Sequence, residues 1–519
     1  DRNPVSLPDT HRQRADTGIC RYGRPRGCSL NGMSGGSFFG DGADTMVLRA
    51  RPSIVALIQA KHAPIYVVLF LPPAVWAMAE QQWFLAACQL VPAGLAALAF
   101  IATSRLSLPS DLRGIEALVS VALIFLISAL LSVPSFVSLG MPPIDALFEA
   151  VSGATTTGLS VAAGPDDWPF AAHFFRSWLQ WCGGLVMATA VLALILPTGV
   201  ASRRLGRAGI DEGDRVASTR RQARQLLGVY VGLTVVLTAL TVLAIPNLAE
   251  AFVLTLSGIS TAGVAPRSDS LASYTILGQS MVILSCIVGA ISLLTFVFLT
   301  RRKPGEAWSL GSIRRVLTAI FCFSALYVVI LVSNGVRDPA VIYGEVLNLI
   351  SGLTPAGYST GGISGSGVVL LLFVVAMAVG GDLGSTAGGL KLARLGLLIR
   401  ALRHALRAPA LPDSAVAPLR QNGRKVDQQA IVSVPALVIV YLLAALALWM
   451  HFLTHDFPAL PSLFETVSTL STVGLSTGLV GPDLPDDLKL SVTFAMWLGR
   501  LEFIAVLVFL SPGTWIKRR

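Results

Sequence analysis

Long apolar runs recur along almost the whole chain, and each is long enough for a helix that crosses a bilayer. They lie near residues 64–80, 83–103, 114–137, 171–197, 226–245, 275–300, 315–333, 367–400, 430–452 and 489–511. A helix needs about 20 mostly apolar residues to cross a hydrocarbon core about 30 Å thick. Because 54% of the residues are apolar and only 13% are charged, the sequence predicts an all-α polytopic membrane protein surrounded by lipid.

The basic residues lie between these runs and indicate the topology. Arginine and lysine crowd residues 199–225, 301–315 and 391–425, whereas the alternate connections carry aspartates. Loops rich in Lys and Arg usually face the cytoplasm, so the aspartate-rich connections are expected outside. The basic loops that set this topology account for the net charge of +10, so no nucleic-acid partner is expected.

Four stretches on the expected outer side resemble one another. They read SGATTTG at 152–158, SGISTAG at 257–263, SGLTPAG at 351–357 and STLSTVG at 468–474. Each follows a short apolar segment with a helix-start signal, for which the candidates are Asp145, Asn247, Asp338 and Ser462. Helices of roughly ten to fifteen residues are too short to cross the membrane, so each is expected to enter from outside and stop midway.

Four re-entrant loops of this kind can surround one cation pathway. Irregular backbone at that depth must be buried in protein or line a watery path. The partly negative C-terminal ends of the half-helices favour a cation, and inward backbone carbonyls can replace its hydration shell. Glycine permits the positive φ angles of such a backbone, so the stretch TTTG is interpreted as one quarter of a cation filter.

With these features the chain resembles the Trk/Ktr/HKT superfamily of potassium transporters, most closely its bacterial Trk-type membrane subunit, over about residues 60–515. In that family four helix–pore loop–helix repeats surround one pseudo-fourfold ion pathway, and two extra helices precede them in the Trk branch. The resemblance also rests on GGDLGSTAGGLKLAR at 380–394, similar to the family's gating loop, and on GRLE at 499–502. It implies a potassium filter made of Thr156, Thr157, Gly158, Thr261, Ala262, Gly263, Pro355, Ala356, Gly357, Thr472, Val473 and Gly474.

A gate is expected where glycines interrupt the longest apolar run, since each glycine in a helix costs ~1 kcal/mol relative to alanine. The expected gating residues are Gly380, Gly381, Asp382, Gly384, Ser385, Thr386, Gly388, Gly389, Lys391 and Arg500. Asp382 is expected either to coordinate a cation or to cap the broken helix. Arg500 is expected to act as an electrostatic barrier below the filter, or else to pair with Glu502.

The resemblance implies potassium as the transported ion, a homodimer, and a cytosolic nucleotide-binding regulatory subunit, in the inner membrane of a bacterium. No organic cofactor is expected in the chain, because no nucleotide-binding glycine-rich loop occurs in a polar segment. The expected organisation is a disordered basic tail at 1–60, a two-helix unit at 61–105, and repeats at 106–205, 206–305, 306–425 (with the gating loop) and 426–519.

Three alternatives remain at this point. The chain could be a sodium-coupled or sodium-permeable cation transporter, because three of the four stretches carry less threonine than the family's filters usually do. A secondary carrier of small organic substrates also uses broken helices. A membrane enzyme would need a metal or catalytic cluster, for which the candidates are His451, His455 and Asp456.

Overall fold

The structure, a computed structural model, describes residues 49–109, 111–194, 215–363, 366–407, 420–421, 424–425 and 428–516. These residues are almost entirely helical, and their only strands are the two-residue pair β1 (Arg420–Gln421) and β2 (Arg424–Lys425). The expected tail up to residue 48 and the basic segments at 199–214 and 408–419 lie outside the described residues.

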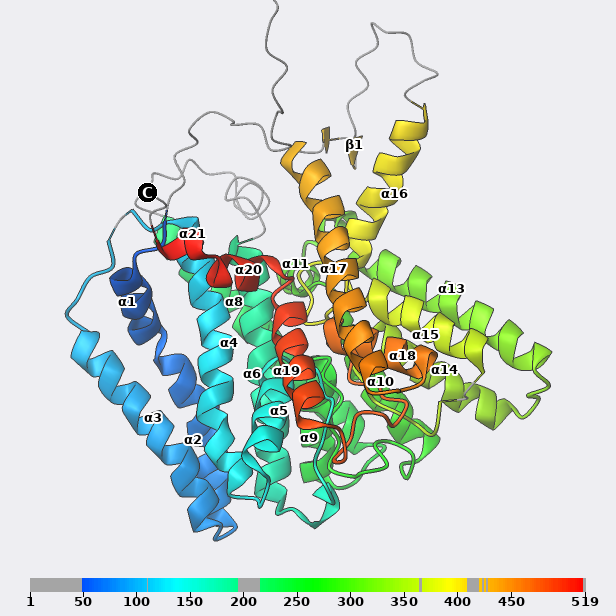
Figure 1. The fold of residues 1–519 in the computed structure, drawn as a ribbon, viewed down its shortest axis with the longest axis horizontal. Helices are drawn as coiled ribbons and strands as arrows, with labels where there is room; N and C mark the ends of the chain where they lie inside the picture. The colour runs from blue at the N-terminus through cyan, green and yellow to red at the C-terminus, as the bar shows by residue number, and fades with distance from the viewer. Residues whose placement is uncertain are drawn as a thin grey trace, which may run out of the picture. The chain divides into compact units, whose positions relative to one another are not determined.

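Six described helical segments are long and apolar enough to cross a membrane. They are α1–α2 (Pro52–His62 and Pro64–Ala79), α3 (Trp83–Thr103), α4 (Gly114–Val137), α13 (Ser312–Ser333), and parts of α8 (Arg215–Val242) and α17 (Gln428–Thr454). In Figure 1, α2 and α3 pack side by side at the left. The protein is therefore an all-α multi-pass membrane protein, as the apolar runs predict.

Several expected spans are broken in the structure. The run at 275–300 divides into α10 (Ile276–Ala290) and α11 (Leu293–Thr300), bent by 90°. The run at 489–511 divides into α19 (Asp486–Arg500) and α20 (Ile504–Leu510), bent by 116°. The run at 367–400 divides into α15 (Gly367–Val379) and α16 (Leu392–Arg407). The run at 171–197 is described as far as residue 194, where it forms α6 (Phe170–Leu194). Against the ten expected spans, the part of the chain that the structure describes has six helices that qualify by length and composition, or eight if each bent pair is one span.

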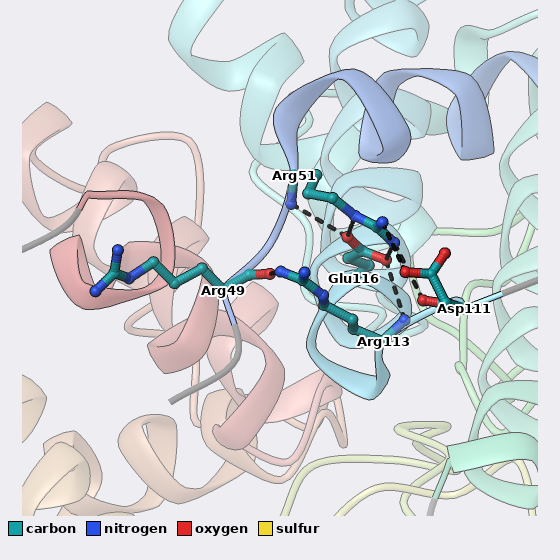
Figure 2. Close-up of polar contacts among 5 residues, drawn as sticks. All are labelled: Arg49, Arg51, Asp111, Arg113 and Glu116. Carbon is teal, nitrogen blue, oxygen red and sulfur yellow. Dashed lines mark hydrogen bonds and ion pairs between the residues drawn. The ribbon is translucent and has the colours of Figure 1, made fainter. Parts of the chain in front are cut away.

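The N-terminal helix α1 corrects the predicted end of the tail, because residues 52–60 are helical. Figure 2 shows what fastens it: the Glu116 carboxylate on α4 is fully buried and accepts hydrogen bonds from Arg51 Nε at 2.7 Å and from Arg113 N at 3.0 Å. Arg51 also pairs with Asp111 at 3.0 Å. A buried carboxylate is stable only when it is paired, so this cluster ties the start of α1 to α4.

Four short helices precede the four similar stretches. They are α5 (Pro143–Ala154), α9 (Leu248–Ile259), α14 (Pro339–Leu353) and α18 (Ala459–Leu470). Asn247 caps α9 by accepting from Ala249 N at 3.1 Å, and Asp338 caps α14 by accepting from Ala340 N at 2.9 Å, as predicted.

The other two predicted helix starts are wrong, because α5 begins after Pro142 and α18 after Pro458. Asp145 lies inside α5 and pairs with Lys489 of α19 at 2.6 Å. Ser462 lies inside α18 and donates to the carbonyl oxygen of Pro458 at 2.7 Å. Asp145 and Ser462, which the sequence pattern assigned to helix caps, therefore form other contacts in the folded protein.

Candidate ion pathway and the 380–391 loop

The four similar stretches adopt one backbone plan. We call residues 155–158, 260–263, 354–357 and 471–474 the four glycine loops. In each, the residue before the glycine donates its N–H to the carbonyl oxygen five residues earlier: Thr157 to Ser152 at 2.9 Å, Ala262 to Ser257 at 3.0 Å, Ala356 to Ser351 at 3.0 Å, and Val473 to Ser468 at 2.8 Å. These bonds turn the chain back over the C-terminal end of its short helix, so the alignment made from the sequence holds at the level of single hydrogen bonds.

Two positions in each glycine loop have positive φ. The glycines do so at Gly158 (84°), Gly263 (79°), Gly357 (71°) and Gly474 (93°). Positive φ also occurs two positions before each glycine, at Thr156 (53°), Thr261 (53°), Pro355 (22°) and Thr472 (49°). Positive φ is costly for residues with a side chain, so the glycine in each loop is explained by its backbone conformation.

The four glycine loops close into a ring. A β-carbon added to each glycine would lie against the carbonyl oxygen of the next loop: at 1.8 Å from Ala262 O for Gly158, 1.9 Å from Ala356 O for Gly263, 2.2 Å from Val473 O for Gly357, and 2.2 Å from Thr157 O for Gly474. The last contact returns to the first loop. Segments more than 300 residues apart in sequence are thus brought together, with four backbone carbonyls in one ring that has no room for a side chain at the glycines.

Two threonine hydroxyls in this ring have no partner among the described residues. Thr156 Oγ1 and Thr472 Oγ1 are both buried without a hydrogen bond. The neighbouring hydroxyls are used locally: Thr157 pairs with Thr155 at 2.8 Å, and Thr261 donates to Ser260 O at 2.7 Å. A buried hydroxyl without a partner is uncommon, so Thr156 and Thr472 offer oxygen atoms to an ion or to water.

A polar side chain on three of the short helices holds the segment that follows its glycine loop. Glu149 accepts from Val161 N at 2.9 Å, Asn348 accepts from Thr360 N at 2.6 Å, and Glu465 accepts from Thr477 N at 2.7 Å. Sequence reasoning missed these supports. The signal that could have found them is their spacing, since each lies three residues before the stretch that was aligned.

Residues 380–391, here called the 380–391 loop, fill the break between α10 and α11. Asp382 N donates to Ala290 O at 3.0 Å, and Leu293 N donates to Gly384 O at 3.0 Å. The loop also touches the ends of two short helices, because Thr386 Oγ1 donates to Ile259 O at 2.9 Å and a β-carbon at Gly388 would lie 2.0 Å from Ser471 O. The loop therefore packs directly against the second and fourth glycine loops.

The two charged side chains of the 380–391 loop, Asp382 and Lys391, both have partners within the protein. Asp382 forms an ion pair with Arg315 at 2.7 Å. Its carboxylate therefore has a partner in the protein and is not free to coordinate a cation in this structure. Lys391 Nζ donates to the carbonyl oxygen of Ala387 and is fully buried. The ion pair with Arg315 therefore fastens the loop to α13, and the Lys391 hydrogen bond stabilises the loop internally.

Arg500, at the end of α19, connects the 380–391 loop to α6. Its Nη1 donates to Thr386 O at 2.8 Å and its Nη2 to Gly183 O at 3.3 Å, and the side chain is fully buried. The expected alternative pair with Glu502 is not made, because Glu502 pairs with Arg394 of α16. Arg500 thus carries its charge beside backbone carbonyls, with no carboxylate as its ion-pair partner among the described residues.

An open pocket is lined mainly by the connections that follow the first and second glycine loops, including Asp166, Arg267 and Ser268. The backbone N–H and the hydroxyl of Ser268 donate to the Asp166 carboxylate at 2.7 and 2.5 Å. These hydrogen bonds hold the pKa of Asp166 below its usual value, because they favour the charged carboxylate. The connection after the first loop is thereby joined to the connection after the second.

The sequence and the fold are similar to those of known cation transport proteins. The chain is 27% identical to the Trk system potassium uptake protein TrkH of Escherichia coli strain K12 over 398 residues, covering 72% of this chain and 79% of that protein. It is 25% identical to an uncharacterized cation transporter of Methanocaldococcus jannaschii over 412 residues, covering 78% and 84%. The crystal structure of the potassium transporter TrkH from Vibrio parahaemolyticus has the same fold, with a TM-score of 0.79 at 21% identity, over 90% of this chain and 100% of that one. The pattern of TrkH, described as a cation transport protein, matches residues 118–336 and 340–515, so this chain belongs to the TrkH family.

Proposed function

We propose that this protein carries potassium ions across the inner membrane of a bacterium, through a filter formed by the four glycine loops. The observation that carries the proposal is the closed ring, in which each glycine lies against the backbone carbonyl of the next loop. The names of the relatives from Escherichia coli and Vibrio parahaemolyticus, both potassium uptake proteins, agree with it.

In this proposal the ring replaces the water around a potassium ion. Backbone carbonyls provide oxygen ligands without a fixed charge, so the ion binds firmly enough to enter and weakly enough to leave. The C-terminal ends of α5, α9, α14 and α18 carry partial negative charge toward the ring and favour a cation. The free hydroxyls of Thr156 and Thr472 add oxygen ligands at the edge of the ring.

The 380–391 loop is the gate in this proposal. It packs against two glycine loops and is held by Arg315 and Arg500, so ions can pass only when it leaves some of these contacts. It continues directly into the basic helix α16, whose last turn carries His404 and Arg407. A cytosolic nucleotide-binding subunit that pulls on α16 would therefore shift the loop between two positions. In this proposal the chain forms a homodimer, and the subunit binds to it.

Purified protein in liposomes tests the function. Uptake of labelled rubidium or potassium is expected to be faster than uptake of sodium at equal concentration. It should need no organic substrate, and empty liposomes should show none. Equal uptake of sodium and potassium would favour the sodium-permeable alternative. Potassium uptake that requires a sodium gradient would favour the coupled one, and no cation uptake by correctly folded protein would overturn the proposal.

A further inference from the structure

We infer that His451, His455 and Asp487 form a binding site for a transition-metal cation such as Zn²⁺, on the side that the charge pattern assigns to the outside. The inference does not depend on the proposed ion pathway. It concerns the end of α17 and the start of α19, the helices that precede and follow α18 and the fourth glycine loop.

The three side chains converge from the end of one helix and the start of another. His451 lies in the last turn of α17, and His455 lies in the turn directly after that helix, where its N–H donates to Phe452 O at 3.1 Å. Asp487 lies in the first turn of α19. Its Oδ2 lies 3.2 Å from His451 Nε2 and 2.7 Å from His455 Nε2, so the two imidazoles point at a single carboxylate oxygen.

The spacing of these atoms is close to what a tetrahedral metal requires. The three ligand atoms lie within 4.8 Å of one another. Zinc binds imidazole nitrogen and carboxylate oxygen at about 2.0–2.2 Å, which separates neighbouring ligands by about 3.3 Å in a tetrahedron. Small side-chain rotations would therefore form three bonds. The side chains are 32%, 29% and 55% exposed, so water can provide the fourth ligand.

The donor atoms also select the kind of metal. Two imidazole nitrogens and one carboxylate suit Zn²⁺, Cu²⁺ or Ni²⁺, whereas Mg²⁺ and Ca²⁺ prefer oxygen ligands only. Potassium has no preference for imidazole nitrogen, so this site and the glycine loops would bind different ions. Among the described residues, this is the one group of three or more His, Cys, Asp or Glu side chains with such spacing.

The sequence had suggested Asp456 as the third member of this cluster, and the structure replaces it with Asp487. Asp456 has a positive φ of 59° in the turn after α17, and its carboxylate is not part of the group formed by His451, His455 and Asp487. Asp487 comes from the start of another helix, 32 residues beyond His455. A metal bound here would therefore link the ends of α17 and α19, whereas a site with Asp456 would link nothing.

Zinc titration of the full-length protein in detergent tests the inference. The protein should be purified without a histidine tag, treated with EDTA and dialysed. Calorimetry is expected to give one Zn²⁺ per chain, and Co²⁺ is expected to give the visible absorption of a four-coordinate site.

Variants distinguish this site from other zinc binding. The double variant His451→Gln/His455→Gln is expected to lose the stoichiometric binding, and Asp487→Asn to weaken it at least ~tenfold. His62→Gln is the matched control, since His62 bonds Ile58 O in α1 and should leave binding unchanged. Binding that survives in the folded double variant, or no saturable binding by the unaltered protein, would overturn the inference.

Discussion

The first and fourth glycine loops rest on equivalent helix contacts but are surrounded by different charges. In the first, α6 packs so closely on α5 that a β-carbon at Gly183 would lie 2.2 Å from Ala154 O. In the fourth, α19 packs on α18 in the same way, and a β-carbon at Gly499 would lie 2.1 Å from Leu470 O. These two glycines therefore mark corresponding positions, from which the neighbouring residues can be compared.

The residues seven positions before these glycines differ in charge. In the first predicted repeat this residue is Arg176, which pairs with the supporting carboxylate of Glu149 at 2.9 Å. In the fourth it is Val492, and the corresponding carboxylate of Glu465 has no basic partner, with its Oε2 unpaired among the described residues. One backbone arrangement is thus supported once by a buried ion pair and once by a lone carboxylate.

The residues directly after these glycines differ as well. The first repeat has Gly184, whereas the fourth has Arg500, which reaches across to the 380–391 loop. In the first region Arg176 pairs with the carboxylate that supports the first glycine loop. In the fourth region Arg500 contacts the 380–391 loop, which is the proposed gate. The shared backbone forms the ring in both regions. We therefore expect the charges that differ to stabilise the protein in one region and to affect the proposed gate in the other.

Removing Arg176 is expected to have the largest effect. Arg176→Met leaves the Glu149 carboxylate buried without its cation, which should destabilise the protein by about 3–5 kcal/mol. Glu465→Gln should cost at most about 1 kcal/mol, because the amide oxygen can still accept from Thr477 N. Unfolding of both variants in detergent measures the difference. Adding Glu149→Gln to Arg176→Met should restore part of the loss, and equal losses in the two single variants would refute the comparison.

Gly158→Ala tests the ring that both repeats share. Its β-carbon would collide with Ala262 O, so the neighbouring carbonyl must turn away, and the preference for potassium over sodium should fall by about tenfold. Gly474→Ala should do the same, since the ring is closed. The matched control is Gly478→Ala, which has a similar φ of 94° but open space around it, and should keep the preference. Uptake of the two ions at equal concentration is the measurement, and a loss in the control would show that backbone strain alone is responsible.

Local features of the fold could be predicted from the sequence, because they depend on short segments. The bounds of α3 and α4 equal those of the predicted runs, and the alignment of the four stretches identified the residues that form the ring. Composition and periodicity act within one helix, and the turn after each short helix is fixed by its own glycine. The position of the site was therefore predictable, although its ion-binding role stays a prediction.

The breaks and pairings could not be predicted, because they depend on residues far apart in sequence. Nothing in the apolar run at 275–300 marks the 90° bend, which arises where Gly384 O accepts from Leu293 N. The pair between Arg394 and Glu502 joins residues 108 positions apart, so the short spacing from Arg500 to Glu502 was misleading. Capping signals failed at Asp145 for the same reason, since Lys489 is its partner.

Arg500→Ala tests the fourth repeat's own contribution. The variant loses the two hydrogen bonds that hold the 380–391 loop to α6, and it removes a buried positive charge near the proposed pathway, so potassium flux should rise severalfold. The ion preference should not change, because the glycine loops keep their contacts. Arg500→Lys keeps the charge but cannot bond both carbonyls, and it should give an intermediate flux. Flux per folded protein is the measurement, and a decrease in Arg500→Ala would assign the arginine to structure alone.

The smallest effect is expected at Pro355, where the third glycine loop departs from the other three. At this position Thr156, Thr261 and Thr472 each donate their N–H to the carbonyl oxygen three residues earlier, at 2.9–3.1 Å, whereas proline has no N–H to donate. The proline ring also favours φ near −65°, although the position has positive φ in all four loops. Pro355→Thr should therefore stabilise the protein by about 0.5–1 kcal/mol and leave the ion preference intact. Pro355→Ala should give the same gain if the backbone is the cause, and lower melting temperatures for both variants would show that packing of the proline ring outweighs the missing hydrogen bond.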